Sequence, residues 1–186
     1  MKQLDVAMAL SRLRHDLLRR GEALSDYFHA TTDSQAIRDA VFAELQKHDF
    51  RVQATICEKS KAQPQVRSSK ARFYQYPWFY QFKHGLAPYV DKGDSLIVTA
   101  ASIGTKKERD TYTNALRDVM QQHLKKEQWA VDFRPAMADP CLQVADYCAW
   151  AIQRKWERND SRSYALIESK ISYQYELWAK GSTHYY

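Results

Sequence analysis

The stretch SLIVTAASIGTKKERDTYTNALRDVMQQHLKKEQWAVDFRP, residues 95–135, predicts a strand, a helix and a second strand in that order. Residues 95–102 are the most strand-like run of the chain, because apolar and β-branched side chains follow one another there without a charge. A helix is expected from about residue 107 to residue 125, and the stretch WAVDFRP, residues 129–135, supplies the second strand. The apolar face of that helix carries Tyr112, Leu116, Val119 and Met120. This order of elements indicates the α/β class.

The segments before residue 95 extend the same alternation of helices and strands. An amphipathic helix is expected over residues 4–18 with Gly21 as its stop, and a second helix is expected to begin with Asp33 as its N-cap. Residues 52–56 alternate apolar and polar side chains in the period of a strand. Together with the two later strands, this pattern indicates a mixed or parallel central sheet that is flanked by helices.

Basic and aromatic residues fill the segment between the first and second predicted strands. Residues 59–72 are expected to form a mobile cationic loop, because they combine five basic side chains with Pro and Ser and contain no acid. An aromatic helix is expected next, with Pro77 in an early turn and an end near Gly85. Two helices, residues 140–157 and 163–178, are expected to complete the chain.

The composition favours one globular domain over residues 1–186. The 186 residues are 45% hydrophobic, and no run approaches the ~18 to 20 apolar residues of a membrane span, so no contact with a membrane is expected. The three cysteines lack CxxC spacing, which argues against a disulfide framework and a zinc site and favours the reducing cytoplasm. The net charge of +6 permits a polyanionic partner such as nucleic acid.

The segment DPCLQVADYCAWAIQRKWE, residues 139–157, places a carboxylate beside the apolar face of a helix. On a helical wheel the expected core face holds Leu142, Ala145, Ala149, Ile152 and Trp156. Asp146 lies at the border of that face, where an acid needs a hydrogen bond, an ion pair or a metal ion, because burial of an unpaired charge is unfavourable. The plainer alternative is a structural acid that is bonded to an Arg or to a backbone amide. Asp139 before Pro140 is ordinary helix initiation.

The segment LQVADYCAWAIQRKWERNDSRSYALI, residues 142–167, resembles the C-terminal signature of a large family known as domain of unknown function 3800, which is regarded as RNase H-like. Members typically carry a Gln followed three residues later by an Asp on the last core helix, here Gln143 and Asp146. The resemblance extends over about residues 27–180. Further matching segments are YFHATTDSQAIRDAVFAEL at 27–45, RVQATICEKSK at 51–61 and SLIVTAASIGTKKER at 95–109. The resemblance implies an RNase H-like fold.

The resemblance also implies a metal-dependent nuclease. RNase H-like nucleases hold two divalent ions, here expected to be Mg²⁺ or Mn²⁺, with acids from separate elements, because two hard cations about 4 Å apart need several carboxylates. Relatives normally open with a strand that bears an acidic motif, whereas this chain begins in a helix, so the first strand and its central acid are expected to be missing. Either the natural start lies upstream, another chain completes the sheet, or the site is degenerate. An exposed sheet edge would favour self-association into a homo-oligomer.

The resemblance and the predicted strand ends together select the candidate site residues. The catalytic candidates are Asp146, Glu58, Asp33 and His29, with Gln143 and Asp139 as supporting residues. Asp146 and Glu58 are expected to bind the metal, and His29 is expected to carry a proton. For His29 and Asp33 a simple turn followed by an N-cap is an equal alternative, and Glu58 is equally explained as a solvated strand end.

Basic side chains of residues 59–72 are the candidates for nucleic-acid binding, and most of the aromatic rings that follow them are assigned to packing. The candidates are Lys59, Lys61, Arg67, Lys70 and Arg72. These residues do not choose between RNA and DNA. The rival interpretation is a non-catalytic RNase H-like module that binds nucleic acid or a protein, with Asp146 kept as a structural acid.

Overall fold

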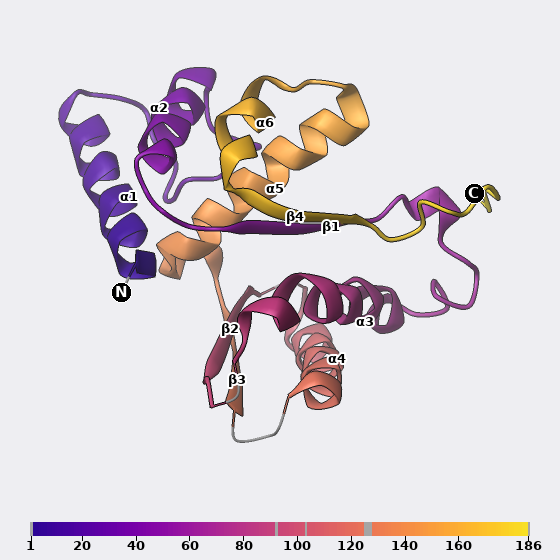
Figure 1. The fold of residues 1–186 in the computed structure, drawn as a ribbon. Coiled ribbons are helices and arrows are strands. Elements are labelled where there is room, and N and C mark those ends of the chain that lie inside the picture. Colours follow the sequence, from indigo (N-terminus) through magenta and orange to yellow (C-terminus); the bar gives the residue numbers. More distant parts are fainter. Residues whose placement is uncertain (1, 92, 103, 125–127, 186) are drawn as a thin grey trace. The chain divides into compact units, whose positions relative to one another are not determined.

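Figure 1 shows a computed structural model of the chain, which describes residues 2–91, 93–102, 104–124 and 128–185. Within these residues the chain holds six α-helices and four β-strands, so the α/β class expected from the sequence is confirmed. None of the helices described is long and apolar enough to cross a membrane. The chain divides into two compact units, which are Met1–Val52 with Arg134–Ser172 and Gln53–Phe133 with Tyr173–Tyr186.

Four helices build the first unit (Figure 1). They are α1 (Lys2–Arg19), α2 (Gln35–Gln46), α5 (Pro140–Arg158) and α6 (Arg162–Ile167). Both α1 and α6 pack on α2 and on α5. The largest buried side chains of this unit are Leu10, Phe28, Ile37, Phe42, Leu45, Tyr147 and Ile167. Burial of this apolar surface is the main term that holds the four helices together.

The first two helices begin and end close to the predicted residues. Gly21 follows α1 with a φ of 79°, a left-handed conformation that favours glycine. The cap of α2 is Ser34, whose side chain accepts a hydrogen bond from Ile37 N, so the prediction of Asp33 as N-cap is wrong by one residue. The physical reason is that the Asp33 carboxylate accepts its hydrogen bonds from the preceding turn and from α5.

Helix α5 turns a different face to the core from the one that the helical wheel predicts. Leu142 and Ile152 are buried as expected, but Ala145 and Ala149 are exposed, and Trp156 is 48% exposed. The buried residues of α5 are Leu142, Gln143, Val144, Tyr147, Cys148, Ala151 and Ile152. The wheel ranks side chains by polarity alone, whereas polar side chains enter this core because distant partners satisfy their hydrogen bonds.

The predicted order of strand, helix and strand is found in the second unit (Figure 1). β2 (Leu96–Ala101) and β3 (Trp129–Arg134) form a parallel two-stranded sheet, and α4 (Lys106–His123) connects them. The predicted end of this helix, Lys125, lies outside the described residues. The core cluster of this unit consists of Phe82, Ala100, Leu116, Val119 and Met120. Most of the predicted apolar face of α4 therefore belongs to the core.

Helix α3 (Lys70–Tyr80) begins inside the segment that is expected to be a loop. Ser69 caps it by accepting a hydrogen bond of 3.1 Å from Arg72 N, so Pro77 lies inside the helix and not in an early turn. A π-helical turn at Gln81–Leu86 follows directly. None of the residues of α3 is fully buried, so its aromatic rings keep part of their surface open.

The last predicted helix, residues 163–178, is wrong in its second half, where the chain forms strand β4 (Ile171–Glu176). β4 pairs in parallel with β1 (Val52–Ile56), and Leu177 N donates to Ile56 O at 2.9 Å just beyond the strand ends. The sequence of β4, ISYQYE, alternates apolar or aromatic with polar side chains, which is typical of a strand. The described strands thus form two separate two-stranded sheets in place of the expected single central sheet.

A capping box begins α4. Thr105 Oγ1 accepts a hydrogen bond of 3.4 Å from Glu108 N, and Thr105 N donates to Glu108 Oε2 at 2.9 Å. Lys70 Nζ, in the first turn of α3, lies 3.1 Å from Glu108 Oε1. The backbone hydrogen bond from Thr105 and the hydrogen bond from Lys70 lower the pKa of Glu108 to about 2.

Replacing Glu108 by alanine is expected to lower the melting temperature at neutral pH, because the cap and the pair with Lys70 are lost. The pKa of Glu108 lies below its ordinary value of 4.5, so its stabilising effect is complete above about pH 5 and disappears as the pH falls toward 2. Thermal unfolding of both proteins across this range should show a difference in melting temperature that narrows on acidification.

The control for this prediction is Asp110→Ala, which removes an exposed acid from the same helix. Its difference from the unchanged protein should be small at every pH. A Glu108→Ala difference that stays constant down to pH 2 would contradict the role of the capping carboxylate.

Candidate functional site

A tight turn at His29–Asp33 carries two of the predicted site residues. Asp33 N and Thr32 N donate to His29 O at 2.9 and 3.0 Å. The Asp33 carboxylate closes the turn, because its Oδ2 accepts a hydrogen bond of 2.9 Å from His29 N. Asp33 is only 7% exposed, and the hydroxyl of Tyr147 on α5 donates to the same Oδ2. These bonds fix the turn to α5.

His29 and Asp146 form a hydrogen-bonded pair at this turn. His29 Nδ1 lies 2.9 Å from Asp146 Oδ2, which also accepts a bond of 2.9 Å from Ala30 N. An ionised carboxylate only accepts hydrogen bonds, so Nδ1 carries the proton and Nε2 of the neutral imidazole is left as an acceptor. The side chains of the pair are 36% and 31% exposed, so a ligand can reach them. The Tyr27 ring stacks on the imidazole with 6.0 Å between ring centres.

The two supporting candidates have different tasks. Gln143 is buried and fixes the segment before the turn, because its Oε1 accepts a bond of 3.2 Å from Phe28 N. Its Nε2 donates to Ala136 O at 3.1 Å, so both ends of the amide are used. Asp139 instead caps α5, where its side chain accepts a bond of 2.8 Å from Cys141 N. Gln143 therefore belongs to the cluster around the turn, whereas the hydrogen bond that Asp139 accepts is that of a helix cap.

Arg38 and Tyr147 also belong to the cluster, although neither is among the predicted site residues. Arg38 donates to Ala30 O at 2.9 Å and to Asp33 O, and its guanidinium lies 5.1 Å from the centre of the Trp150 ring. Burial and the hydrogen bond to Asp33 raise the pKa of Tyr147, so its hydroxyl stays protonated and donates. The one signal for Tyr147 is its place next to the predicted carboxylate, and nothing in the sequence separates Arg38 from the other arginines.

Glu58 belongs to the second unit and has partners there. Its Oε2 lies 2.8 Å from Lys61 Nζ, and its Oε1 accepts a bond of 2.9 Å from Ser60 Oγ and lies 3.5 Å from His184 Nδ1. The hydrogen bond with Lys61 lowers the pKa of Glu58 and raises that of Lys61. The structure thus gathers four of the candidates in one cluster of the first unit, which are His29, Asp33, Gln143 and Asp146.

The residues that the structure describes do not assemble the expected site for Mg²⁺ or Mn²⁺. Among them, no group of three or more His, Cys, Asp or Glu side chains could hold a metal ion. Asp33 Oδ2 already accepts two hydrogen bonds in a buried position, and the second expected ligand, Glu58, is paired with Lys61. Two hard cations need more carboxylates than this cluster offers.

None of the three cysteines forms a disulfide, and Cys148 is buried whereas Cys57 and Cys141 are partly buried. Burial raises the pKa of Cys57 to about 11 and that of Cys148 to about 12. Burial also raises the pKa of Cys141. Because the thiolate is the reactive form, none of the three is expected to act as a nucleophile at neutral pH.

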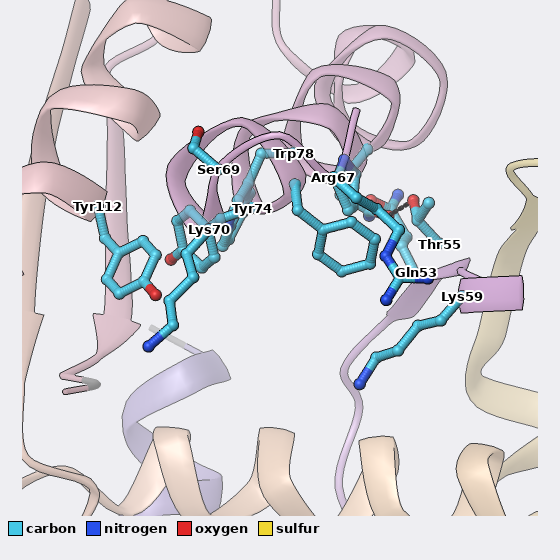
Figure 2. Close-up of a pocket in the computed structure, with 12 residues that line it drawn as sticks. Gln53, Thr55, Lys59, Arg67, Ser69, Lys70, Tyr74, Trp78 and Tyr112 are labelled. Carbon is cyan, nitrogen blue, oxygen red and sulfur yellow. Dashed lines mark hydrogen bonds between the residues drawn. The ribbon is translucent and has the colours of Figure 1, made fainter. Parts of the chain in front are cut away.

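The five basic candidates for nucleic-acid binding fall into two groups. Lys59, Arg67 and Lys70 line a pocket of the second unit (Figure 2). Lys61 is held by Glu58 and is outside that lining. Arg72 is exposed and is outside it as well. Three of the five basic candidates therefore line the pocket, although the sequence does not distinguish them from the other two.

Comparisons of the chain with protein-family models, with curated proteins and with solved structures found no match. The resemblance to domain of unknown function 3800 therefore stays a prediction from the quoted segments. What the cluster can do follows from its own geometry. A histidine with one nitrogen bonded to a carboxylate, and the other without a partner in the described part of the chain, can move a proton.

Proposed function

We propose that the cluster in the first unit cleaves phosphodiester bonds, with His29 as the group that moves the proton and Asp146 as the group that positions it. The observation that carries this proposal is the 2.9 Å bond between His29 Nδ1 and Asp146 Oδ2. The bond holds the imidazole in one tautomer and one orientation. Nε2 is then ready to accept a proton from a substrate hydroxyl.

We infer that the substrate is RNA, because RNA brings its own nucleophile. His29 Nε2 takes the proton of a 2′-hydroxyl, the 2′-oxygen attacks the adjacent phosphorus, and the bond to the 5′-oxygen breaks. The departing 5′-oxygen takes a proton from solvent, so the products are a 2′,3′-cyclic phosphate and a 5′-hydroxyl. DNA lacks the 2′-hydroxyl and needs an activated water, for which RNase H-like nucleases use two ions.

A metal-dependent nuclease of RNase H-like fold, with Mg²⁺ or Mn²⁺ at Asp146, is the second candidate. The observation in its favour is that four residues selected with the help of the resemblance lie together around one turn. A divalent ion held there by Asp146 would supply activation of a water, so the expected cleavage leaves no cyclic product and acts on DNA as well as on RNA. The three free cysteines support a reducing compartment such as the cytoplasm for either activity.

The test is a cleavage assay with the full chain on a labelled single-stranded RNA and on DNA of the same sequence, each with EDTA and with Mg²⁺ or Mn²⁺. We expect RNA to be cut in EDTA, with a cyclic phosphate at the new end, and DNA to stay intact. Cleavage that requires the ion and leaves no cyclic phosphate would support the second candidate. If the folded protein cuts neither the RNA nor the DNA, both candidate activities are rejected, and the interpretation as a non-catalytic binding module remains.

Replacing Asp146 by asparagine is expected to lower kcat for RNA cleavage about 10- to 100-fold, because a neutral amide no longer selects one imidazole tautomer. KM should change little, since Asp146 contacts His29 and Ala30 and acts through His29. Single-turnover rates measure the loss in the cleavage step, and the dependence of the rate on substrate concentration measures KM. The matched control is Asp26→Asn, an exposed acid just before the turn. An equal loss in both variants would contradict a specific role for Asp146.

A further inference from the structure

The second unit contains a pocket of about 640 Å³ between β1, the segment that follows it, α3 and α4 (Figure 2). This volume lies within the roughly 300–1,000 Å³ of small-molecule sites. Aromatic, amide and basic side chains line the pocket, and no acidic side chain of the described residues does. This composition indicates a ligand that combines a planar apolar part with a negative charge.

Aromatic rings form part of the pocket wall. Phe73 and Tyr74 of α3 and Tyr112 of α4 line it, and the ring centres of Tyr74 and Tyr112 lie 4.7 Å apart with an angle of 52° between the rings. The rings of α3 are only half-buried in the unit. Open ring faces of this kind are platforms on which a nucleobase stacks, whatever its sequence.

Two glutamines and a threonine supply the polar atoms of the pocket. Thr55 Oγ1 donates to Gln81 Oε1 at 2.7 Å, and Gln81 Nε2 donates to Gln53 Oε1 at 3.5 Å. These bonds leave the Gln53 amide nitrogen without a partner among the described residues, so the pocket still offers amide donors to the edge of a base. Gly85 makes room for this arrangement, because a Cβ at Gly85 would lie 2.8 Å from Gln81 Nε2.

Basic side chains supply the charge. In Figure 2 the side chains of Lys59 and Lys70 extend toward the same side of the pocket from opposite edges, and Arg67 is a further basic residue of the lining. Lys70 is paired with Glu108 at 3.1 Å, and Lys59 and Arg67 are the other two basic side chains of the lining. A positive pocket edge beside open rings matches a phosphate that is attached to a base.

We propose that this pocket binds one nucleotide of a single-stranded nucleic acid, with the base against the rings and glutamines and the phosphate at Arg67 and Lys59. A duplex keeps its base faces stacked and does not fit. The inference rests on the second unit alone, and it does not require that the first unit cleaves RNA. A free nucleotide has the same chemistry, so the experiment compares the two sources.

The first arm of the test measures binding of a labelled single-stranded RNA of about ten nucleotides by fluorescence anisotropy, with the full chain carrying His29→Ala so that cleavage does not interfere. Arg67→Gln should raise Kd about tenfold and flatten its salt dependence by about one phosphate contact. Arg117→Gln is the matched control, because it makes the same change at an exposed arginine of the same unit outside the pocket lining. Its Kd should change less than about twofold. An equal loss of affinity in both variants would show that general electrostatic attraction, and not the pocket, accounts for the binding.

The second arm tests the base. Tyr112→Leu removes a stacking ring, and Gly85→Ala displaces the Gln81 amide, so each should raise Kd about tenfold at an unchanged melting temperature. Unchanged affinity in both variants, or equal affinity for a duplex, would overturn the base pocket. Titration with AMP and UMP tests whether free nucleotides are the ligand. If either nucleotide binds as tightly as the single strand, the proposal that the ligand is a strand is overturned. A folded protein that binds no single strand would overturn the proposal as well.

Discussion

Replacing His29 by alanine is expected to slow RNA cleavage by a factor of about 10² to 10⁴, the range for loss of a general acid–base group. The reason is that Nε2 of His29 is the proposed proton acceptor for the 2′-hydroxyl. The fold should survive the change, because the ring is 36% exposed and the turn is closed by the backbone N–H of residue 29, which donates to Asp33. Initial rates on labelled single-stranded RNA measure the effect.

Two further measurements make this prediction specific. His15→Ala removes an exposed imidazole from α1 and should leave the rate unchanged. Added imidazole should restore part of the rate of His29→Ala, because it supplies the missing proton acceptor in the space of the lost ring. A folded His29→Ala protein that cleaves RNA at the original rate would show that His29 does not move the proton.

Replacing Tyr147 by phenylalanine is expected to lower the free energy of unfolding by about 1–3 kcal/mol, the cost of a buried polar group that loses its partner. Tyr147 is fully buried and Asp33 is 7% exposed, so the change leaves a buried carboxylate with one donor fewer. The ring keeps its contacts, among them the edge of Phe42 at 5.4 Å between ring centres, so no cavity adds to the effect. Denaturant-induced unfolding measures the loss.

A double-mutant cycle shows whether the Tyr147 hydroxyl acts through Asp33. In an Asp33→Asn background the same Tyr147→Phe change should cost less, because the charged acceptor is already absent. The control Tyr173→Phe, in β4 and only partly buried, should stay within about 0.5 kcal/mol. An equal cost of Tyr147→Phe in both backgrounds would show that the Tyr147 hydroxyl does not stabilise the protein through Asp33.

Short-range geometry explains why several site candidates meet in the structure. Gln143, Asp146 and Tyr147 stand at helical spacing on α5 and therefore share one face. The prediction of Glu58 depends on a different rule, according to which the ends of neighbouring strands meet at one edge of a sheet. That rule requires a shared sheet, whereas the strands of the described residues form two sheets, in which β1 pairs with β4 and β2 pairs with β3. The sequence does not show which strands become neighbours. The rule therefore points to Glu58, which has local partners of its own.

The sequence by itself determined the features that depend on residues a few positions apart. Asp139 caps α5 because its side chain reaches the amide of Cys141 two residues later, and Gly21 follows α1 because glycine adopts the left-handed conformation there. The order of strand, helix and strand in the region of residues 95–135 likewise follows from a hydrophobic period that is complete within the segment.

Only the tertiary structure decided the features that depend on a distant partner. Residues 171–176 form a strand and not the end of a helix, because β1, far earlier in the chain, accepts and donates their backbone hydrogen bonds. The face of α5 that is buried, and the burial of Asp33, depend in the same way on bonds that Gln143 and Tyr147 make across the unit. A polar side chain is buried only where another element satisfies its hydrogen bonds, and local spacing does not reveal that element.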